Sequence, residues 1–116
     1  MTEQAEPKPI QWTIHTTHPE RVEKVRASLS EVVDPEIGMN IIQLGLVRDI
    51  QIENEMARLK MILTTPFCPY GPAMIEMTKA KAVEGLSMPV TIEMGMEMWD
   101  FSMMEDPSAL DWGMYA

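Results

Sequence analysis

The single cysteine of the chain, Cys68, lies inside the stretch TTPFCPYGP that runs from Thr64 to Pro72. Pro66 and Pro69 stiffen this stretch, and neither has an N–H group that would compete for the sulfur. The stretch precedes a helix-forming run, and the N-terminal end of a helix stabilises an anion such as a thiolate. Cys68 is therefore a candidate reactive or metal-binding residue. The alternative is a small buried apolar side chain, because free cysteine is among the most buried residue types.

Two acidic residues, Asp34 and Glu36, flank Pro35, and two threonines, Thr64 and Thr65, precede the cysteine. Taken alone, the acidic residues fit a solvated turn and the threonines fit turn caps. In a two-layer fold, however, the loop after a first helix can approach the turn after a second strand. Carboxylates brought near a thiolate in this way could ligate iron or steer the protonation of the thiol.

Two helices are predicted to position these residues. Thr17 and Glu20 form a capping box, so a first helix is expected to begin at Thr17. It should end near Asp34, because the residue before a proline avoids helical geometry. The run 72–86 has a good helix-forming composition and predicts the second helix.

Three strands are predicted from alternating apolar and polar residues, over 46–52, 57–63 and 90–98. The inward residues are even-numbered in the first strand and odd-numbered in the second. Both sets share one face only if the numbers of paired residues add up to an odd value, which a two-residue hairpin loop satisfies. Arg48 interrupts the apolar set of the first strand, and the pattern alone does not explain it.

These elements predict an α/β fold, a two-layer sandwich in the order helix-strand-strand-helix-strand. One-sided strands indicate a small mixed sheet with helices on one face. The second strand, its helix and the third strand should form a right-handed parallel crossover. Residues 1–16 are expected to be a mobile N-terminal tail, and residues 17–116 a single domain with a C-terminal arm from about residue 99.

Composition narrows the function classes. The chain has 116 residues and a formal net charge of -9, which argues against a nucleic-acid partner and against an anionic membrane surface. It contains no apolar run of the roughly 18 residues that a membrane-spanning helix needs. No secretory signal is apparent at the N-terminus, so a cytoplasmic location is expected. No serine-histidine-acid set or phosphate loop is discernible, and no histidine is clearly placed as the base of a thiol enzyme. A non-enzymatic role is therefore expected, and a thiol-based activity stays open as the alternative.

The C-terminal part is rich in methionine and aromatic residues. Met94, Met96 and Met98 have the spacing of some copper-binding stretches, and thioethers select Cu(I). The same spacing in a strand points all three to one face, so packing in a core or a subunit interface is the favoured interpretation. Together with the aromatic residues of the last 18 positions, this predicts a homodimer or another homo-oligomer.

Three ordered motifs resemble one known family. They are VVDPEIGMNIIQLGLV (32–47), MILTTPFCP (61–69) and MEMWDFSMMEDPSALDWGMY (96–115). Together they resemble the SufT-like family of iron-sulfur cluster assembly proteins, which also contains PaaD-like proteins and the eukaryotic cytosolic iron-sulfur targeting subunit. The similarity runs from about Val22 to Tyr115. One departure is Glu97-Met98-Trp99, which stands where the family commonly has a PPW sequence.

The resemblance implies a functional site where the acidic turn meets the threonine-and-cysteine turn. The site residues carried over by position are Cys68, Asp34, Glu36, Thr64 and Thr65. The residues carried over as structural parts of the motifs are Pro35, Asn40, Gly45 and Pro69. A transient iron-sulfur cluster or iron bound through Cys68 is the implied cofactor, and an assembly scaffold and client apoproteins are the implied partners.

Three functions therefore remain open from the sequence. The first is an accessory factor that assembles or delivers iron-sulfur clusters through Cys68. The second is a non-catalytic adaptor that binds client and scaffold proteins through the methionine-rich and aromatic C-terminal surface, with Cys68 structural. The third is a PaaD-like accessory subunit that matures one multicomponent oxygenase.

Overall fold

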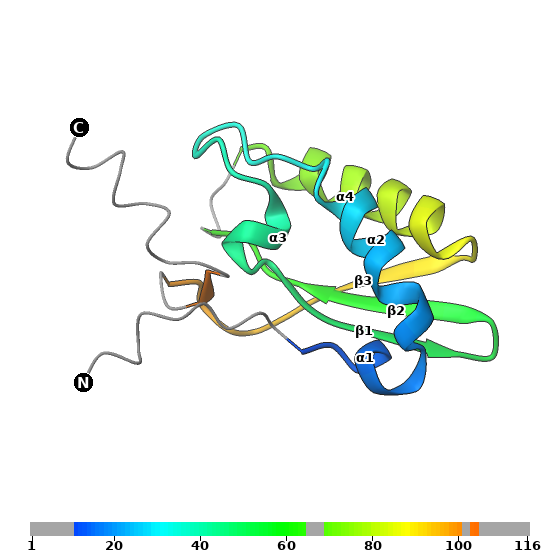
Figure 1. The fold of residues 1–116 in the computed structure, drawn as a ribbon. Helices are drawn as coiled ribbons and strands as arrows, with labels where there is room; N and C mark the ends of the chain where they lie inside the picture. Colours follow the sequence, from blue (N-terminus) through cyan, green and yellow to red (C-terminus); the bar gives the residue numbers. More distant parts are fainter. Residues whose placement is uncertain (1–10, 65–68, 101–102, 105–116) are drawn as a thin grey trace, which may run out of the picture.

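A computed structural model describes residues 11–64, 69–100 and 103–104 of the chain. Figure 1 shows a small sheet with two longer helices packed over it. The elements in chain order are α1 (Ile14–Thr17), the 3-10 helix η2 (Pro19–Arg21), α2 (Val22–Leu29), α3 (Ile41–Leu44), β1 (Val47–Glu53), β2 (Met56–Met61), α4 (Gly71–Leu86) and β3 (Val90–Met94). None of the helices among the described residues is long and apolar enough to cross a bilayer.

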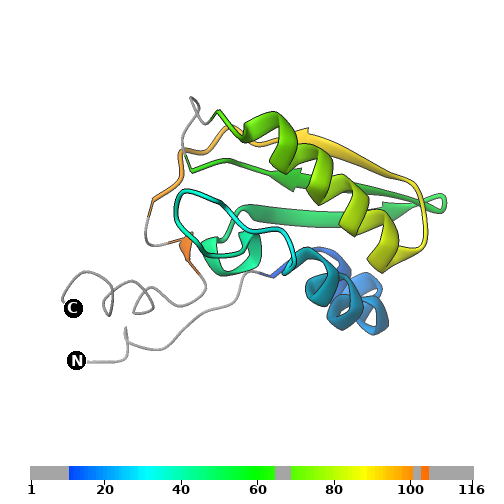
Figure 2. The same ribbon diagram turned by 90° about the horizontal axis from the view of Figure 1, so that it is seen from above.

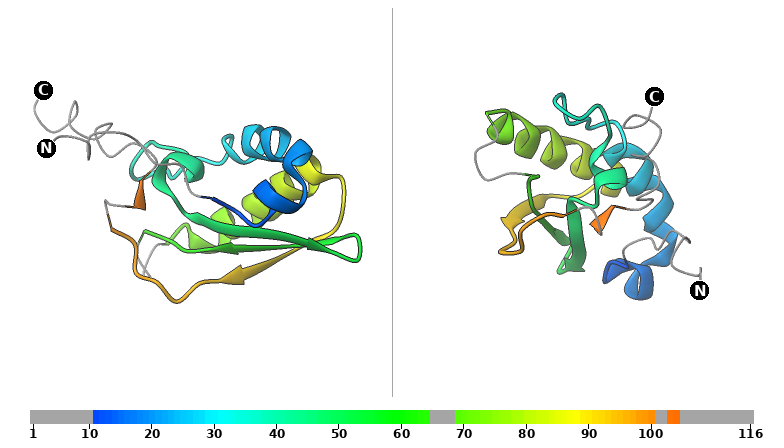
Figure 3. Two further views of the ribbon diagram at one scale, coloured as in Figure 1. Left: turned by 60° about the horizontal axis from the view of Figure 1, so that its bottom comes forward. Right: turned by 90° about the vertical axis from the view of Figure 1, so that its left-hand side faces the viewer.

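The predicted two-layer α/β sandwich is confirmed. The sheet has the strand order β1-β2-β3, with β1 and β2 antiparallel and β2 and β3 parallel. Helices α2 and α4 lie side by side on one face of this mixed sheet, as Figures 2 and 3 show from two further directions. The core between the layers is apolar, with Val25, Leu29, Leu59 and Leu86 fully buried.

The hairpin confirms the parity argument. Ile50 pairs with Leu59 and Ile52 pairs with Ala57, so the numbers of each pair add up to an odd value, and the loop consists of two residues, Asn54 and Glu55. Both loop residues have positive φ angles, 53° and 61°. These angles are typical of a type I′ turn, whose twist matches that of the flanking strands.

A β-bulge explains why Arg48 interrupts the apolar pattern of β1. The register shifts between Val47, which pairs with Met61, and Asp49, which pairs with Lys60. The extra residue in β1 is Arg48, and the bulge moves it out of the inward-facing apolar set. Its side chain donates a hydrogen bond of 2.9 Å to the carbonyl of Gly45.

The first helix differs from the prediction at both ends. Thr17 does not cap it, because Thr17 is the last residue of α1, and His18 separates α1 from η2. The helix α2 then ends at Leu29, where the Ser30 hydroxyl donates to the carbonyl of Arg26 at 2.7 Å. Beyond Ser30 the backbone continues with tighter bonds between residues three apart, from the Glu31 N–H to the Ser28 carbonyl at 3.2 Å and from the Val32 N–H to the Leu29 carbonyl at 3.0 Å.

The expected N-terminal tail over 1–16 ends earlier than predicted. Trp12 and Ile14 are buried, with 3% and 0% of their surface exposed. The Trp12 indole donates to the carbonyl of Val47 at 3.0 Å, and the Thr13 backbone N–H donates to Asp49 Oδ1 at 2.7 Å. These contacts hold α1 against β1, so residues 12–16 are part of the folded domain.

The third strand is shorter than predicted. It ends at Met94 instead of continuing to residue 98, and its pairing with β2 ends with Met61 and Met94. Helix α4 (Gly71–Leu86) follows the prediction over 72–86 closely. The predicted C-terminal arm falls largely on residues 101–102 and 105–116, which lie outside the described residues.

Candidate functional site

Asp34 is the buried centre of the acidic turn. Only 1% of its surface is exposed, and it is one of two buried polar residues in the described part of the chain. Its Oδ1 accepts the backbone N–H of Glu36 at 2.9 Å, and its carbonyl accepts the N–H of Gly38 at 2.7 Å. This is an Asx-turn, in which the aspartate side chain takes the place of a backbone acceptor. Asp34 thus fixes the shape of the turn through Oδ1, while its second carboxylate oxygen, Oδ2, can accept a hydrogen bond from another segment.

That second oxygen faces Thr64. The Thr64 hydroxyl donates to Asp34 Oδ2 at 3.4 Å, a long hydrogen bond across 30 residues of sequence. Thr64 lies three residues beyond the end of β2, so the structure brings the acidic turn to the carboxyl end of this central strand. Thr65 and Cys68, the other candidates of this stretch, lie outside the described residues.

Glu36 and Pro35 lie on the surface of the same turn. Both are exposed, and Glu36 takes part in the Asp34 network through its backbone N–H and not through its carboxylate. The two acidic residues therefore have different environments, although they are only two positions apart. Asp34 is buried and bonded, whereas the Glu36 side chain faces solvent.

Asn40 and Gly45 bound the short helix α3. The Asn40 side chain accepts the N–H of Gln43 at 2.8 Å, and the Gln43 side chain accepts the N–H of Asn40 at 3.0 Å. This is a reciprocal capping box. Gly45 ends the helix in the left-handed conformation, with φ 76°, which glycine adopts at little cost. Pro69, the remaining motif residue, is exposed just before α4.

A pocket of about 380 Å³ adjoins Thr64. It is lined by residues that follow β2 and by residues at the end of β3 and beyond, namely Ile62, Leu63, Thr64, Met94, Gly95, Met96, Glu97, Met98 and Trp99. Because β2 and β3 are parallel, their carboxyl ends meet at one edge of the sheet, which is where open α/β sheets commonly bind ligands. The pocket and the Asp34–Thr64 contact therefore form one continuous region.

Two polar contacts anchor the rim of this pocket. The Trp99 indole N–H donates to the carbonyl of Leu44 at 2.6 Å, which ties the segment after β3 to the end of α3. The Glu97 carboxylate lies 3.5 Å from Arg48 Nε. A hydrogen bond from its own backbone N–H, together with the charge of Arg48, lowers the pKa of Glu97 despite slight desolvation.

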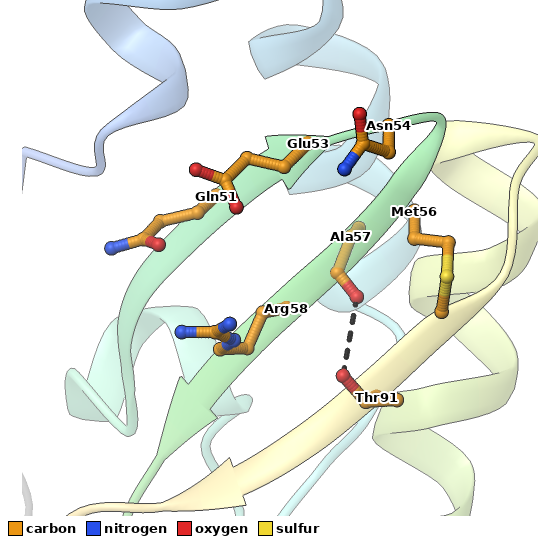
Figure 4. Close-up of a pocket in the computed structure, with 7 residues that line it drawn as sticks. All are labelled: Gln51, Glu53, Asn54, Met56, Ala57, Arg58 and Thr91. Atoms are coloured by element: carbon orange, nitrogen blue, oxygen red, sulfur yellow. Dashed lines mark hydrogen bonds between the residues drawn. The ribbon is translucent and has the colours of Figure 1, made fainter.

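A second cavity, of about 170 Å³, lies at the hairpin end of the sheet. Figure 4 shows Gln51 and Glu53 of β1, Arg58 of β2 and Thr91 of β3 around it, with the Thr91 hydroxyl bonded to the Ala57 carbonyl. It lies at the start of β2, whereas Thr64 follows the end of that strand. The cavity is thus remote from the candidate site.

The acidic turn does not form a metal centre by itself. Within residues 11–64, 69–100 and 103–104, no three His, Cys, Asp or Glu side chains come close enough to hold a metal ion. Asp34 can contribute at most part of a ligand set, and any iron ligation there needs donors from elsewhere.

Sequence reasoning missed two features of this region. It weighed Asp34 and Glu36 as a carboxylate pair, whereas burial and hydrogen bonding separate them. It also placed Met94, Met96 and Met98 in a core or a subunit interface, and the structure excludes the core of this chain, because they line the pocket and are exposed. Asp directly before Pro favours the start of a turn, and an aspartate side chain in a turn commonly bonds its own backbone two residues on, so the first signal was present in the sequence.

The chain is similar to several known proteins. A family model described as iron-sulfur cluster assembly protein matches residues 22–94, the segment from α2 to β3. An Fe-S protein maturation auxiliary factor from Porphyromonas gingivalis is 30% identical over 97 residues, which cover 78% of this chain and 90% of that protein.

A second relative matches over a shorter segment. It is an Fe-S protein maturation auxiliary factor from Bacillus subtilis, 36% identical over 58 residues, and the match covers 49% of this chain but 57% of that protein. Among solved structures, a domain of unknown function from Bacillus anthracis superposes with a TM-score of 0.71 at 25% identity, covering 84% of this chain and 95% of that one.

Proposed function

Since the chain belongs to the iron-sulfur cluster assembly protein family, we propose that it is an accessory factor in the maturation of iron-sulfur proteins. In this role it helps to assemble a cluster or to deliver one to client apoproteins. The cluster is cargo, and the protein needs no catalytic residue of its own to carry it.

The observation that carries this proposal is the contact between Asp34 and Thr64. It joins the acidic turn to Thr64, just beyond the end of β2. Thr64 lies four residues before Cys68 in the chain and seven before Gly71, the first residue of α4. One residue from each of these two family motifs, Asp34 and Thr64, thereby meets the other at one end of the sheet. Binding residues are often carried by loops that a rigid scaffold positions, and both residues of this contact lie outside the helices and strands.

In the proposed mechanism the Cys68 thiolate is a ligand to iron. One thiolate does not hold a cluster, since clusters usually take four protein ligands. The remaining ligands come from the assembly scaffold, from the client or from a low-molecular-weight thiol. Asp34 shapes the turn beside the site, and the exposed Glu36 carboxylate is free to approach the bound iron. Such incomplete ligation makes the cluster labile, which suits transfer.

The test is anaerobic reconstitution of the wild type and of Cys68→Ser with iron and sulfide, followed by absorption spectroscopy and iron counting. Glu53→Gln, a change at the distant hairpin, is the control for nonspecific effects. We expect cluster absorbance and bound iron in the wild type and the control and their loss in Cys68→Ser. Equal absorbance in all three proteins would reject the thiolate-ligand mechanism.

An adaptor function is the second candidate, and exposed apolar residues on the acidic turn favour it. Val33 is 45% exposed and Ile37 is 38% exposed, on either side of Asp34. Exposed apolar groups of this kind suit a protein contact. In this alternative, which includes a PaaD-like subunit serving one oxygenase, Cys68→Ser leaves client maturation unchanged, whereas Val33→Ser with Ile37→Ser weakens partner binding.

The predicted homo-oligomer, the assembly scaffold and the clients remain proposals within this function. Analytical ultracentrifugation of the full chain measures the oligomeric state directly. A sedimentation mass equal to one chain over a range of concentrations would reject self-association.

A further inference from the structure

Three methionines at the end of β3 and just beyond it line a single pocket. Met94, Met96 and Met98 all line the cavity of about 380 Å³ beside Thr64. Their exposed fractions are 43%, 96% and 78%. They do not pack in the core of this chain, so the remaining alternatives for Met96 and Met98 are a ligand role and a contact with another protein chain.

The segment that carries them is fixed at several points. The Gly95 N–H donates to the carbonyl of Met61 at 2.8 Å, and the Trp99 indole binds the Leu44 carbonyl at 2.6 Å. Gly95 also needs its small size, because an added Cβ would lie 3.0 Å from Ile62 Cγ2. The methionines therefore extend from a backbone that is held on both sides.

The chemistry of the pocket favours a soft cation. Thioether sulfur is a soft, neutral donor that selects Cu(I) over hard cations such as Mg²⁺ and Ca²⁺. Three thioethers leave the charge of the ion uncompensated, and the Glu97 carboxylate lines the same pocket. Burial of apolar surface contributes about 25 cal/mol per Å² to stability, and the exposed methionine side chains do not gain this free energy in the single chain. A ligand role gives their placement a physical reason.

We propose that Met94, Met96 and Met98 form a thioether binding site for a soft monovalent cation, namely Cu(I). The ion binds without any change of oxidation state, and each sulfur donates one lone pair. The methionine side chain has three rotatable bonds and adapts to the ion after the backbone is in place. This site does not involve Cys68 and is independent of the proposed function.

Silver(I) is the probe for the first experiment because it mimics Cu(I) and is not readily oxidised. The titration uses the Cys68→Ser variant, since a thiolate would otherwise compete for the ion. The protein is labelled with ¹³C at the methionine methyl groups, and silver nitrate is added in chloride-free buffer. We expect the methyl signals of Met94, Met96 and Met98, three of the 13 methionines, to shift together and to saturate at one equivalent.

Two sets of substitutions assign the site. Met94→Leu, Met96→Leu and Met98→Leu combined keep the apolar volume and remove the sulfur, so saturable binding should disappear. Met56→Leu with Met77→Leu is the matched control, because these methionines are 48% and 44% exposed and lie elsewhere. The control should bind silver as the Cys68→Ser protein does. Circular dichroism confirms that all variants remain folded.

X-ray absorption of the Cys68→Ser protein loaded anaerobically with Cu(I) provides the second readout. Sulfur scatterers in the first coordination shell, lost in the triple leucine variant, support the site. Binding that persists in the triple leucine variant, or silver shifts that are spread over all methionine methyls, would overturn it.

Discussion

The Thr64 hydroxyl donates a hydrogen bond of 3.4 Å to Asp34 Oδ2, while Oδ1 of the same carboxylate accepts the N–H of Glu36 at 2.9 Å. The shorter bond is the stronger one, so the local turn and not the contact with Thr64 holds the Asp34 side chain in place. Thr64 is then positioned by a carboxylate that the turn has already oriented. The acidic turn and the end of β2 are thus joined through a single buried residue.

The first prediction concerns this buried carboxylate. Asp34→Ala should lower the free energy of unfolding by about 1–3 kcal/mol, because the N–H of Glu36 and the Thr64 hydroxyl lose their acceptor. Asp34→Asn keeps one amide oxygen and should lose less. Urea unfolding followed by circular dichroism measures both.

Glu36→Ala is the control for the acidic turn. The Glu36 side chain is exposed, so the substitution should change the free energy of unfolding by no more than about 0.5 kcal/mol. An equal loss for Glu36→Ala and Asp34→Ala would contradict the assignment of Asp34 as the residue that shapes the turn.

The second prediction concerns pH. Partial burial alone would raise the pKa of Asp49, but hydrogen bonds from Thr13, Gln51 and Ile50 together lower it below the ordinary value of 3.8. A carboxyl with a lowered pKa contributes stability that is complete above the ordinary value and is lost as pH falls through the lowered one. Wild type should therefore be more stable than Asp49→Asn near neutral pH, and the difference should shrink below about pH 4.

Denaturant unfolding of both proteins at several pH values checks this expectation. Glu93→Gln, an exposed acid on the same open face of the sheet, is the control. A difference between wild type and Asp49→Asn that stays constant down to low pH would show that the tie between α1 and β1 does not depend on the Asp49 charge.

The third prediction concerns the contact between the two long helices. A Cβ at Gly85 would lie 2.8 Å from Val25 Cα and 3.1 Å from Ser28 Oγ. Gly85→Ala should therefore destabilise the protein, because overpacking costs about 1–3 kcal/mol and outweighs the helix-propensity gain of about 1 kcal/mol. Glu76→Ala, on the exposed side of α4, should be neutral or slightly stabilising. Stabilisation by Gly85→Ala in thermal unfolding would refute the close approach of α2 and α4.

The fourth prediction concerns the hairpin turn. Glu55 has φ 61°, which costs a residue with a side chain roughly 1–2 kcal/mol relative to glycine. Glu55→Gly should therefore raise the free energy of unfolding by about 1 kcal/mol. Glu53→Gly, a matched change at the last residue of β1, should lower it because glycine weakens a strand. Urea unfolding distinguishes the two, and equal effects would argue against the left-handed geometry at Glu55.

The hairpin and α4 were predictable because their signals are local. Alternation places side chains on one face or the other, and the parity of paired numbers then allows a two-residue loop and excludes a three-residue one. Arg48 could not be explained in this way, because a bulge is an exception to alternation. Its position depends on pairing with a strand that is distant along the chain.

The start of the first helix was mispredicted because tertiary contacts outweigh the local capping motif. Thr17 and Glu20 match a capping box, but the buried Trp12 and Ile14 anchor α1 to β1 and place Thr17 at the end of a helix. The true capping box is at Asn40 and Gln43, in a stretch where no helix was expected. A cap motif shows that a helix can begin at a residue, and packing decides whether it does.

By itself, the sequence determined the α/β class, the mixed sheet, the hairpin register and the family, because apolar periodicity and ordered motifs are properties of the chain. Only the tertiary structure decided that Asp34 is buried against Thr64 while Glu36 is exposed, and that Met94, Met96 and Met98 line a pocket instead of a core. The physical reason is that burial and side-chain contact depend on which distant segments pack together. Residues of the same type and spacing therefore acquire different environments once the chain has folded.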